Sequence, residues 1–440
     1  MKLPEHVLFC LDRLENASFS AYAVGGCVRD DCLGLTPHDY DLCTNAKPEQ
    51  IQAIFRDHGL VLAGVKHGTV GVITEGGVVE ITTYRTEGDY QDNRHPGWVE
   101  FVDDIRGDLA RRDFTVNAMA WSPRRGFADP FGGRTDLDRK ILRTVGDPEL
   151  RFREDSLRIL RGVRFAARYS LTPDPETEEA MFRLAPLMDN LARERAFDEL
   201  CKLLLCAKAT DLIRFAPVIT QVIPELAPAV GFDQKNHHHI HDIFSHTAYV
   251  VENAPQALPL RWAALLHDVA KPQCFTVDED GVGHFYGHAG QSAELAEQIL
   301  LRLKAPTALR QEVALLIRHH MTLIPTEKKA VRRWLGKLGQ ETFFQLLKLQ
   351  LADTLATGTE HDLTLFDRLR ELAREILEEQ TCLTVKDLAI NGRDLMALGF
   401  TGPAIGHGLN LLLEQVMDET LENTKDALLR AATALSDHEK

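Results

Sequence analysis

The chain has 440 residues, of which 44% are apolar and 26% charged, and its formal net charge is −15. These values are typical of an ordinary soluble globular protein with about two to four domains. No stretch approaches the roughly 18 apolar residues that a membrane span requires, so the composition excludes a membrane-spanning protein. The eight cysteines form no CxxC pair, and acidic residues interrupt the apolar pattern of the N-terminal MKLPEHVLFCLDRLE. We therefore expect no secretory signal, reduced cysteines and a cytoplasmic location.

The charge is unevenly distributed along the chain. Residues 106–168 contain 15 Lys and Arg against 9 Asp and Glu, whereas residues 371–440 contain 6 against 13. A basic middle within an acidic chain fits a localised phosphate-binding surface.

The first 120 residues predict a small mixed sheet with helices. Apolar spacing predicts a helix over residues 3–15, and Pro48 can begin another that extends to Phe55. Short β-like runs follow at residues 60–62, 69–74 and 78–83. Gly76-Gly77 lies between the last two runs and indicates a hairpin.

The stretch from Tyr22 to Asp41 carries the first chemical signal. Gly25-Gly26 marks a turn, and a helix over residues 27–33 opens directly after it, where a helix N-terminus suits a phosphate. Asp39 and Asp41 are two residues apart, so on a strand their carboxylates converge and favour a divalent cation between them. Glu80, in a later strand, is a candidate third carboxylate.

The string GGCVRDDCLG followed by HDYDLCT resembles the class II CCA-adding tRNA nucleotidyltransferase and bacterial poly(A) polymerase family. The resemblance implies a polymerase β-type head that uses Mg²⁺ held by Asp39 and Asp41. It implies that Gly26, Arg29 and Arg112 hold the nucleotide triphosphate. It further implies that the polar loop 88–96 moves between nucleotide additions.

The segment 154–169 predicts an amphipathic helix with four arginines on one face. Asp155 lies beside Arg158 on this helix, and a carboxylate with a guanidinium could read the Watson–Crick edges of C and A. The string EDSLRILR resembles the family's amino-acid template. The resemblance implies that Asp155 and Arg158 select CTP and ATP, and that Arg161 and Arg164 lie on phosphates.

A second set of metal-ligand residues follows in the later half of the chain. The ligand order resembles that of HD-type metal-dependent phosphohydrolases, and its members are His246, His267, Asp268, His288, His320 (with His319 an open alternative) and Asp353. Imidazoles and carboxylates suit a transition metal such as Ni²⁺ or Mn²⁺, which would activate water against a phosphoester. The alternative is an HD-like helical domain retained as a tRNA-binding body.

We therefore expect an α+β protein: a head over residues 1–140, an all-α neck over 141–215, an HD-type helical body over 216–368 and a helical tail over 369–440. The expected reaction adds C, C and A to the 3′ end of tRNA from CTP and ATP by two-metal nucleotidyl transfer, and the expected cofactor is Mg²⁺. A partial CC- or A-adding enzyme, a poly(A) polymerase and a phosphohydrolase acting through the HD residues remain alternatives.

Overall fold

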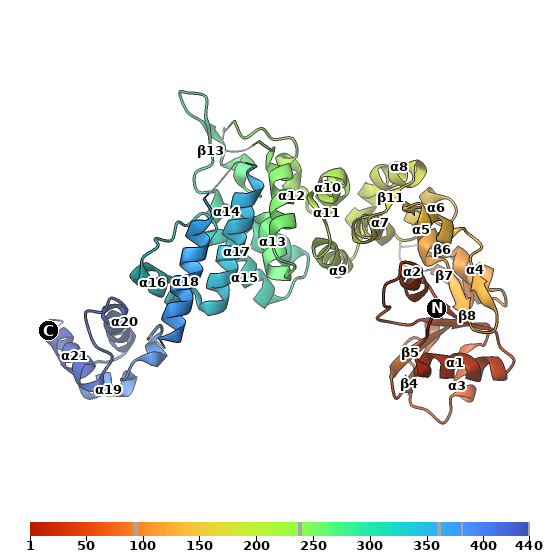
Figure 1. The fold of residues 1–440 in the computed structure, drawn as a ribbon, viewed down its shortest axis with the longest axis horizontal. Helices are drawn as coiled ribbons and strands as arrows, with labels where there is room; N and C mark the ends of the chain where they lie inside the picture. The colour runs from red at the N-terminus through yellow and green to blue at the C-terminus, as the bar shows by residue number, and fades with distance from the viewer. Residues whose placement is uncertain (91–95, 236–239, 359–361, 380–381, 439–440) are drawn as a thin grey trace. The chain divides into compact units, whose positions relative to one another are not determined.

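The computed structural model describes residues 1–90, 96–235, 240–358, 362–379 and 382–438. It divides into two compact units, Met1–Ala227 and Pro228–Lys440. The large sheet belongs to the first unit, and the second unit is mostly helical (Figure 1). The predicted fold class, an α+β head followed by a mostly helical chain, is confirmed, but the prediction of an all-α neck is wrong, because β10 (Ile141–Leu142) pairs with β11 (Thr172–Pro173) within it. The finer boundaries at residues 140, 215 and 368 stay predictions.

A seven-stranded mixed sheet forms the head, with the strand order β3-β4-β5-β2-β1-β8-β9. Its strands are β1 (Ala21–Val24), β2 (Leu42–Thr44), β3 (Leu60–Val61), β4 (Thr69–Thr74), β5 (Gly77–Thr83), β8 (Ala120–Ser122) and β9 (Gly126–Ala128). Strand β1 runs antiparallel to both β2 and β8, whereas β2 runs parallel to β5. The predicted hairpin at Gly76-Gly77 is confirmed, because β4 and β5 pair antiparallel on either side of it.

Two shorter sheets complete the strands of the first unit. They are β6 (Arg85–Tyr90) with β7 (Pro96–Phe101), and β10 (Ile141–Leu142) with β11 (Thr172–Pro173). The predicted polar loop 88–96 falls on the β6–β7 ribbon, and its residues 91–95 lie outside the described part of the chain.

The described residues of this unit also form eleven helices and three 3₁₀ turns. They are α1 (Glu5–Asn16), α2 (Gly26–Cys32), α3 (Pro48–Ile54), η1 (Val65–His67), α4 (Ile105–Ala110), η2 (Thr115–Asn117), α5 (Gly133–Asp138), α6 (Pro148–Glu154), α7 (Leu157–Tyr169), α8 (Pro175–Arg183), η3 (Ala185–Asn190), α9 (Arg193–Leu204), α10 (Ala209–Arg214) and α11 (Ala216–Val222). One core of this unit joins the sheet to α4 through Val24, Cys43, Ala120 and Leu109. Helix α7 packs against α9.

Two sequence predictions about local structure were wrong. The strand that carries the two aspartates begins only at Leu42, so Asp39 and Asp41 precede it. The predicted helix 154–169 is interrupted at Asp155, whose backbone is extended (φ −146°, ψ 104°). Its Oδ1 accepts a hydrogen bond from the backbone N–H of Leu157 at 3.1 Å. Because an aspartate side chain can satisfy a free N–H at a helix start, a new helix begins there instead of continuing.

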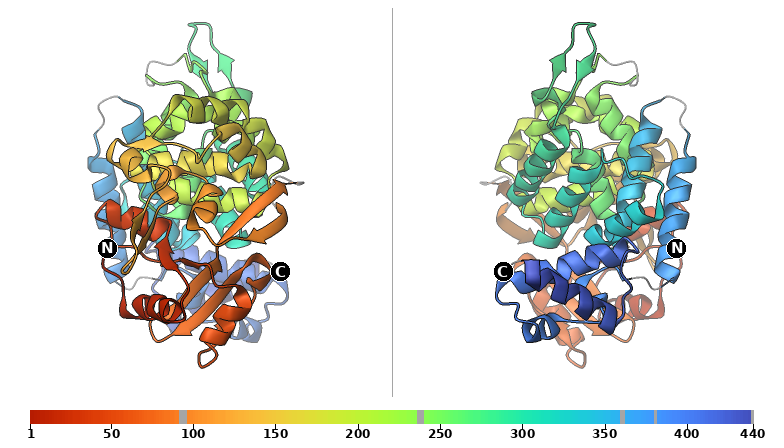
Figure 2. Two further views of the ribbon diagram at one scale, coloured as in Figure 1. Left: turned by 90° about the vertical axis from the view of Figure 1, so that its right-hand side faces the viewer. Right: turned by 90° about the vertical axis from the view of Figure 1, so that its left-hand side faces the viewer.

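The second unit is a helical body with a helical tail. After the 3₁₀ turn η4 (Pro224–Ala229), its elements are α12 (Ile243–Asn253), α13 (Leu258–Leu266), η5 (Lys271–Gln273), β12 (Thr276–Val277), β13 (Gly283–His284), α14 (His288–Arg302), α15 (Thr307–His319), α16 (Lys328–Leu338), α17 (Gln340–Ala356), α18 (Thr364–Glu378), η6 (Val385–Asp387), α19 (Gly392–Ala397), α20 (Pro403–Met417) and α21 (Lys425–His438). Helix α12 packs against α13 and α17, and α13 packs against α15. The β12–β13 hairpin projects away from these helices (Figure 2).

The core of the body contains the fully buried side chains of Trp262, Leu266, Leu316 and Leu347. These residues come from α13, α15 and α17, so apolar burial brings the ends of these helices to one place. A separate apolar core, which includes Leu395, Leu412 and Leu428, holds α19, α20 and α21 together. Within the described residues, no helix is both long and apolar enough to cross a membrane.

Candidate functional site

The carboxylates of Asp39, Asp41 and Glu80 line one cavity of about 500 Å³ in the head. Leu42 pairs with Ile81 in the parallel ladder between β2 and β5. Asp41 and Glu80 are the residues immediately before this pair, so they lie side by side at the same end of the two strands. The backbone carbonyl of Asp41 also accepts a hydrogen bond from the N–H of Val24 at 3.0 Å, which holds Asp41 against β1. The sheet thus fixes the position of Asp41, although Asp41 lies outside the strand.

The electrostatic environment of Asp41 favours a cation. Its pKa is raised above the ordinary value, first because the surrounding protein displaces solvent and then because of the negative charges of Glu80 and Asp39; Arg112 opposes the shift. Carboxylates that share a cavity repel each other when they are ionised, and a hard divalent cation such as Mg²⁺ removes that repulsion. Carboxylate oxygens are the donors that Mg²⁺ prefers, so the residue types of this cavity suit the ion.

Gly25 forms the turn between β1 and α2 with φ 77° and ψ −122°, a conformation that L side chains rarely adopt. A Cβ atom at this position would lie 2.7 Å from Nη1 of Arg112, too close for any real contact. The guanidinium of Arg112 thus lies directly against the turn, and its Nη2 also donates to Asp108 at 3.4 Å. Its Nε is buried and has no hydrogen-bond partner among the described residues. Gly26 begins α2 beside it.

Arg29 is buried, with 6% of its surface exposed, and its guanidinium is occupied by protein groups. It donates to Asn117, to Asp30 at 2.7 Å and to the hydroxyl of Tyr169 at 2.6 Å. Its charge also lies 4.3 Å from the ring centroid of Tyr169, which is a favourable cation–π distance. Arg29 therefore ties α2 to α7. Its predicted contact with a phosphate stays a prediction.

The two predicted base-selecting residues bind other partners in this structure. Asp155 accepts two hydrogen bonds from Arg195 of α9, at 2.7 and 3.2 Å. Arg158 pairs with Glu154 and donates to the backbone carbonyl of Arg111 at 3.0 Å. The sequence did not indicate Arg195 as the partner of Asp155, because the two residues are 40 positions apart and meet only through the packing of α7 on α9.

A chain of buried ion pairs extends along the same face of α7. Arg161 donates to Asp113 at 2.7 Å, and Arg164 donates to Glu199 at 2.5 Å. Although burial disfavours charge on Asp113, Arg161 and Asn117 hold the pKa of this carboxyl well below its ordinary range. Arg164 is buried, whereas Arg161 keeps an exposed edge. The predicted phosphate contacts of these two arginines stay predictions.

In the second unit, all six predicted ligands of the later His/Asp set meet in one cluster, which comprises His246, His267, Asp268, His288, His320 and Asp353; all of them are buried except Asp353, which is partly exposed. Asp268 lies in the middle: its Oδ2 is 3.1 Å from Nε2 of His267, and its Oδ1 is 3.4 Å from Nε2 of His288. His246 contributes Nε2 at 2.9 Å from Oδ1 of Asp353. His320, not His319, belongs to the cluster, since Nε2 of His320 lies 3.8 Å from Asp268.

Three of the imidazoles are oriented by the backbone. Nδ1 of His267, His288 and His320 lies 2.8, 2.7 and 2.6 Å from a carbonyl oxygen three residues earlier in the chain. Because a carbonyl can only accept, each Nδ1 carries the hydrogen, and the Nε2 of a neutral ring presents a lone pair to the cluster. The Nε2 atoms of His288 and His320 are buried without a hydrogen bond to any described residue. Inward-facing imidazole and carboxylate donors of this kind fit a transition metal.

Charge in the cluster is balanced in part by the protein itself. Burial disfavours protonation of His267, but Asp268 and Asp353 outweigh it and raise the pKa of this imidazole to about 10, so a metal ion that binds its Nε2 would displace a proton there. Burial lowers the pKa of His320 to about 4. Lys271 places its Nζ 2.7 Å from Oδ2 of Asp268. Lys271 was not among the predicted site residues, and the signal that could have indicated it is its position three residues after Asp268.

Three family models match separate parts of the chain. "Poly A polymerase head domain" matches residues 21–143, "Probable RNA and SrmB- binding site of polymerase A" matches residues 170–229, and the second domain of tRNA nucleotidyltransferases matches residues 277–432. The first two models cover most of the unit with the carboxylate cavity, and the third covers most of the unit with the His/Asp cluster.

Two relatives that align with the chain over nearly its whole length are both CCA-adding enzymes. The chain is 32% identical over 446 residues to the CCA-adding enzyme of Leuconostoc citreum, covering 98% of this chain and 96% of the relative. It is 34% identical over 429 residues to that of Levilactobacillus brevis, covering 96% of each. Among solved structures, the Bacillus stearothermophilus CCA-adding enzyme in complex with CTP matches with a TM-score of 0.78 and 28% identity, over 100% of this chain and 99% of that one.

We predict that Gly25→Ala lowers nucleotide transfer far more than Gly34→Ala. Both glycines have positive φ, but only at Gly25 does the added Cβ meet a neighbour, Nη1 of Arg112. Each substitution costs about 1–3 kcal/mol of stability because of its backbone conformation, which denaturant unfolding measures. The additional loss of activity at Gly25 reports the displacement of Arg112. Equal transfer rates for the two variants would contradict this role of Arg112.

Proposed function

We propose that this chain, which belongs to the family of CCA-adding enzymes, extends the 3′ end of tRNA with C, C and A from CTP and ATP. The observation that carries the proposal is that Asp39, Asp41 and Glu80 line one cavity, with the backbone of Asp41 hydrogen-bonded to Val24, the residue before the Gly25 turn. Both full-length relatives reported above are named CCA-adding enzymes, which favours complete CCA addition over partial addition and over poly(A) synthesis. Substrates of this kind also fit the expected cytoplasmic location.

The reaction is nucleotidyl transfer. The 3′-hydroxyl oxygen of the tRNA loses its proton to solvent and attacks the α-phosphorus of the nucleotide, a new P–O bond forms, the bond between the α-phosphorus and the bridging oxygen breaks, and pyrophosphate leaves with that electron pair. Asp39 and Asp41, with Glu80 beside them, would hold Mg²⁺. Two such ions would acidify the hydroxyl and stabilise charge on the α-phosphate and pyrophosphate. Arg112 supplies a fixed positive charge at the same turn, next to Gly26, for the triphosphate.

Base selection in this proposal rests on Asp155 and Arg158. A carboxylate accepts from the exocyclic amine that C and A share, and a guanidinium donates to ring nitrogens and carbonyls. Arg195 holds both oxygens of Asp155, and Glu154 holds Arg158. Arg195 and Glu154 thus hold the two side chains in position before the nucleotide binds. The incoming base then forms its hydrogen bonds with side chains that are already oriented.

A second candidate function is metal-dependent phosphoester hydrolysis in the second unit. The observation that favours it is the set of buried imidazoles whose Nε2 atoms point into one cluster with Asp268 and Asp353. A transition metal such as Ni²⁺ or Mn²⁺ bound there would provide activated water and charge stabilisation for a phosphoester. The chain's own contribution would be the orientation of the ligands by the backbone carbonyls and the charge of Lys271.

We predict that the protein, given Mg²⁺, CTP and ATP, adds C, C and A to tRNA that ends at its discriminator base. Sequencing of the product ends measures this. Asp41→Ala should lower the rate by on the order of a thousandfold or more, because metal charge stabilisation contributes several kcal/mol. Asp103→Ala, which removes an exposed carboxylate of the head, should have little effect. Failure of the wild-type protein to incorporate C would refute the proposal.

We predict that Arg158→Ala retains the fold. The ratio of its incorporation rate with CTP or ATP to that with GTP or UTP should fall by about 10- to 100-fold, since a good base contact discriminates by about that factor. Single-nucleotide incorporation with each triphosphate measures the preference. Arg153→Ala is the matched control, because Arg153 is an exposed arginine of α6 that pairs with Glu149. An unchanged preference in Arg158→Ala would exclude this residue from base selection.

We predict that the purified protein retains a stoichiometric transition metal and that His267→Ala loses it. Elemental analysis measures the content. Hydrolysis of a 2′,3′-cyclic nucleotide with added Ni²⁺ or Mn²⁺ tests the activity, which should disappear in the same variant. His319→Ala should keep both, because His319 packs against Trp334 outside the cluster. Metal binding without hydrolysis would leave the cluster a structural site and remove the second function.

A further inference from the structure

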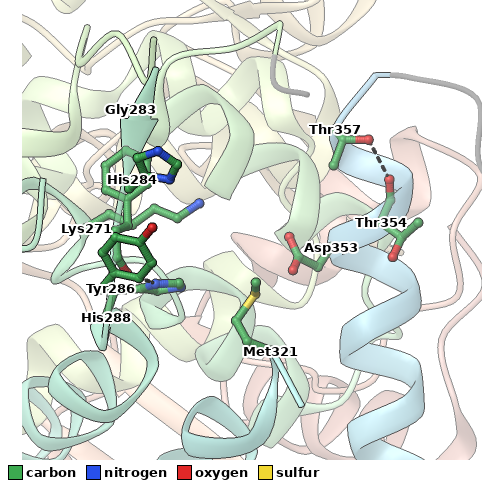
Figure 3. Close-up of a pocket in the computed structure, with 10 residues that line it drawn as sticks. Lys271, Gly283, His284, Tyr286, His288, Met321, Asp353, Thr354 and Thr357 are labelled. Atoms are coloured by element: carbon green, nitrogen blue, oxygen red, sulfur yellow. Dashed lines mark hydrogen bonds between the residues drawn. The ribbon is translucent and has the colours of Figure 1, made fainter. Parts of the chain in front are cut away.

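A pocket of about 380 Å³ in the second unit opens directly onto the His/Asp cluster. Two members of the cluster, His288 and Asp353, line it from opposite sides, as Figure 3 shows. Asp353 comes from α17, and the opposite wall comes from η5 and the β12–β13 hairpin. A volume in the range of about 300–1,000 Å³ is typical of small-ligand sites. The pocket is therefore large enough for a molecule that reaches the cluster.

Lys271 supplies the positive charge of this pocket. Its side chain is buried, its Nζ lies 2.7 Å from Oδ2 of Asp268, and it lies 5.2 Å from the ring centroid of Phe285. In Figure 3 the amine points toward the space between the two walls. An ammonium group in this position suits the phosphate of a ligand whose phosphorus lies at the cluster.

The outer part of the pocket carries a pair of flat rings. His284 and Tyr286 stack on each other with an interplanar angle of 11° and a centroid distance of 5.3 Å. Tyr286 is 75% exposed, an unusual exposure for a large aromatic side chain. His284 is held from behind, since its Nε2 lies 2.7 Å from Asp278.

The β12–β13 hairpin fixes the position of His284, on which Tyr286 stacks. Asp278 also accepts from the backbone N–H groups of Asp280 and Val282, at 3.1 and 2.8 Å, so the carboxylate that holds His284 is itself fixed by the turn. Thr276 pairs with His284 in the two-stranded ladder. His284 is thus fixed by the hairpin, and Tyr286 stacks on it. A ring that is already held in place loses little side-chain freedom when another flat ring stacks nearby.

We propose that the His284–Tyr286 pair is a stacking surface for the base of a nucleotide whose phosphate lies between Lys271 and the His/Asp cluster. The inference deepens the second candidate function and rests on it. The pocket supplies the three parts that such a ligand needs: ligands for a metal at the phosphorus, a cation for the phosphate oxygens and an aromatic face for the base. Stacking on aromatic side chains tolerates any base, so the surface selects nucleotides as a class.

The test compares two probes that differ only in the base. Adenosine 5′-monophosphate and ribose 5-phosphate are titrated into the full-length, Mn²⁺-loaded protein by calorimetry, and an assay for released phosphate separates the heat of binding from any turnover. Tyr286→Ala should weaken binding of the adenosine nucleotide by about tenfold and leave ribose 5-phosphate unchanged. Tyr286→Phe should restore it, because the ring is kept. Val277→Ala, an exposed apolar residue of the same hairpin outside the pocket lining, is the matched control.

The outcomes separate this inference from the function on which it rests. If both probes bind the wild-type protein equally, or if Tyr286→Ala binds the nucleotide as tightly as wild type does, the stacking surface is refuted while the phosphate site stands. If neither probe binds, both the surface and the hydrolase function are refuted. A third titration with a short RNA that ends in a 3′-phosphate shows, by its affinity relative to the mononucleotide, whether a free nucleotide or an RNA end is the preferred form of the ligand.

Discussion

Charge that is removed from water must be paired, and this constraint shapes both units of the protein. In the first unit the buried charges find partners within the chain: Arg29 with Asp30 and Arg164 with Glu199. In the second unit the buried donors of the cluster keep inward-facing atoms, such as Nε2 of His320, without a hydrogen-bond partner among the described residues. The first arrangement fixes the positions of structural elements, whereas the second leaves coordination capacity that a metal ion would use.

In the first unit a series of paired polar and charged groups connects the sheet region to α7, the helix that carries Arg158. Asn117 accepts from Arg29 and donates to Asp113, and Asp113 in turn accepts from Arg161. The turn that carries Gly25 is thereby joined through α2 and η2 to α7. Loss of one partner in such a series leaves its neighbour buried and unpaired, which costs about 3–5 kcal/mol. The position of α7 relative to the carboxylate cavity is accordingly well determined within this unit.

In the second unit the orientation of the ligands comes from the backbone. Each of His267, His288 and His320 binds the carbonyl oxygen three residues earlier, so every ring leaves its helix or turn in a fixed direction. Lys271 lies three residues beyond Asp268 and holds one of its oxygens. The turn after α13 therefore places the cation at the edge of the pocket, next to the hairpin residue His284 and to Tyr286 just beyond it.

The sequence by itself determined the features that depend on near neighbours in the chain. The Gly25-Gly26 turn, the hairpin at Gly76-Gly77 and most helices follow from local backbone preference and apolar spacing, and the string around Asp39 and Asp41 was specific enough to indicate the family. Tertiary structure alone decided which residues meet. The register between β2 and β5 places Glu80 beside Asp41. Asp155 pairs with Arg195, although helical spacing favoured Arg158 as its partner. His320, and not its neighbour His319, lies within reach of Asp268. The physical reason is that ion pairs and strand registers depend on how distant segments pack, and side-chain periodicity within one segment carries no information about its partner in another.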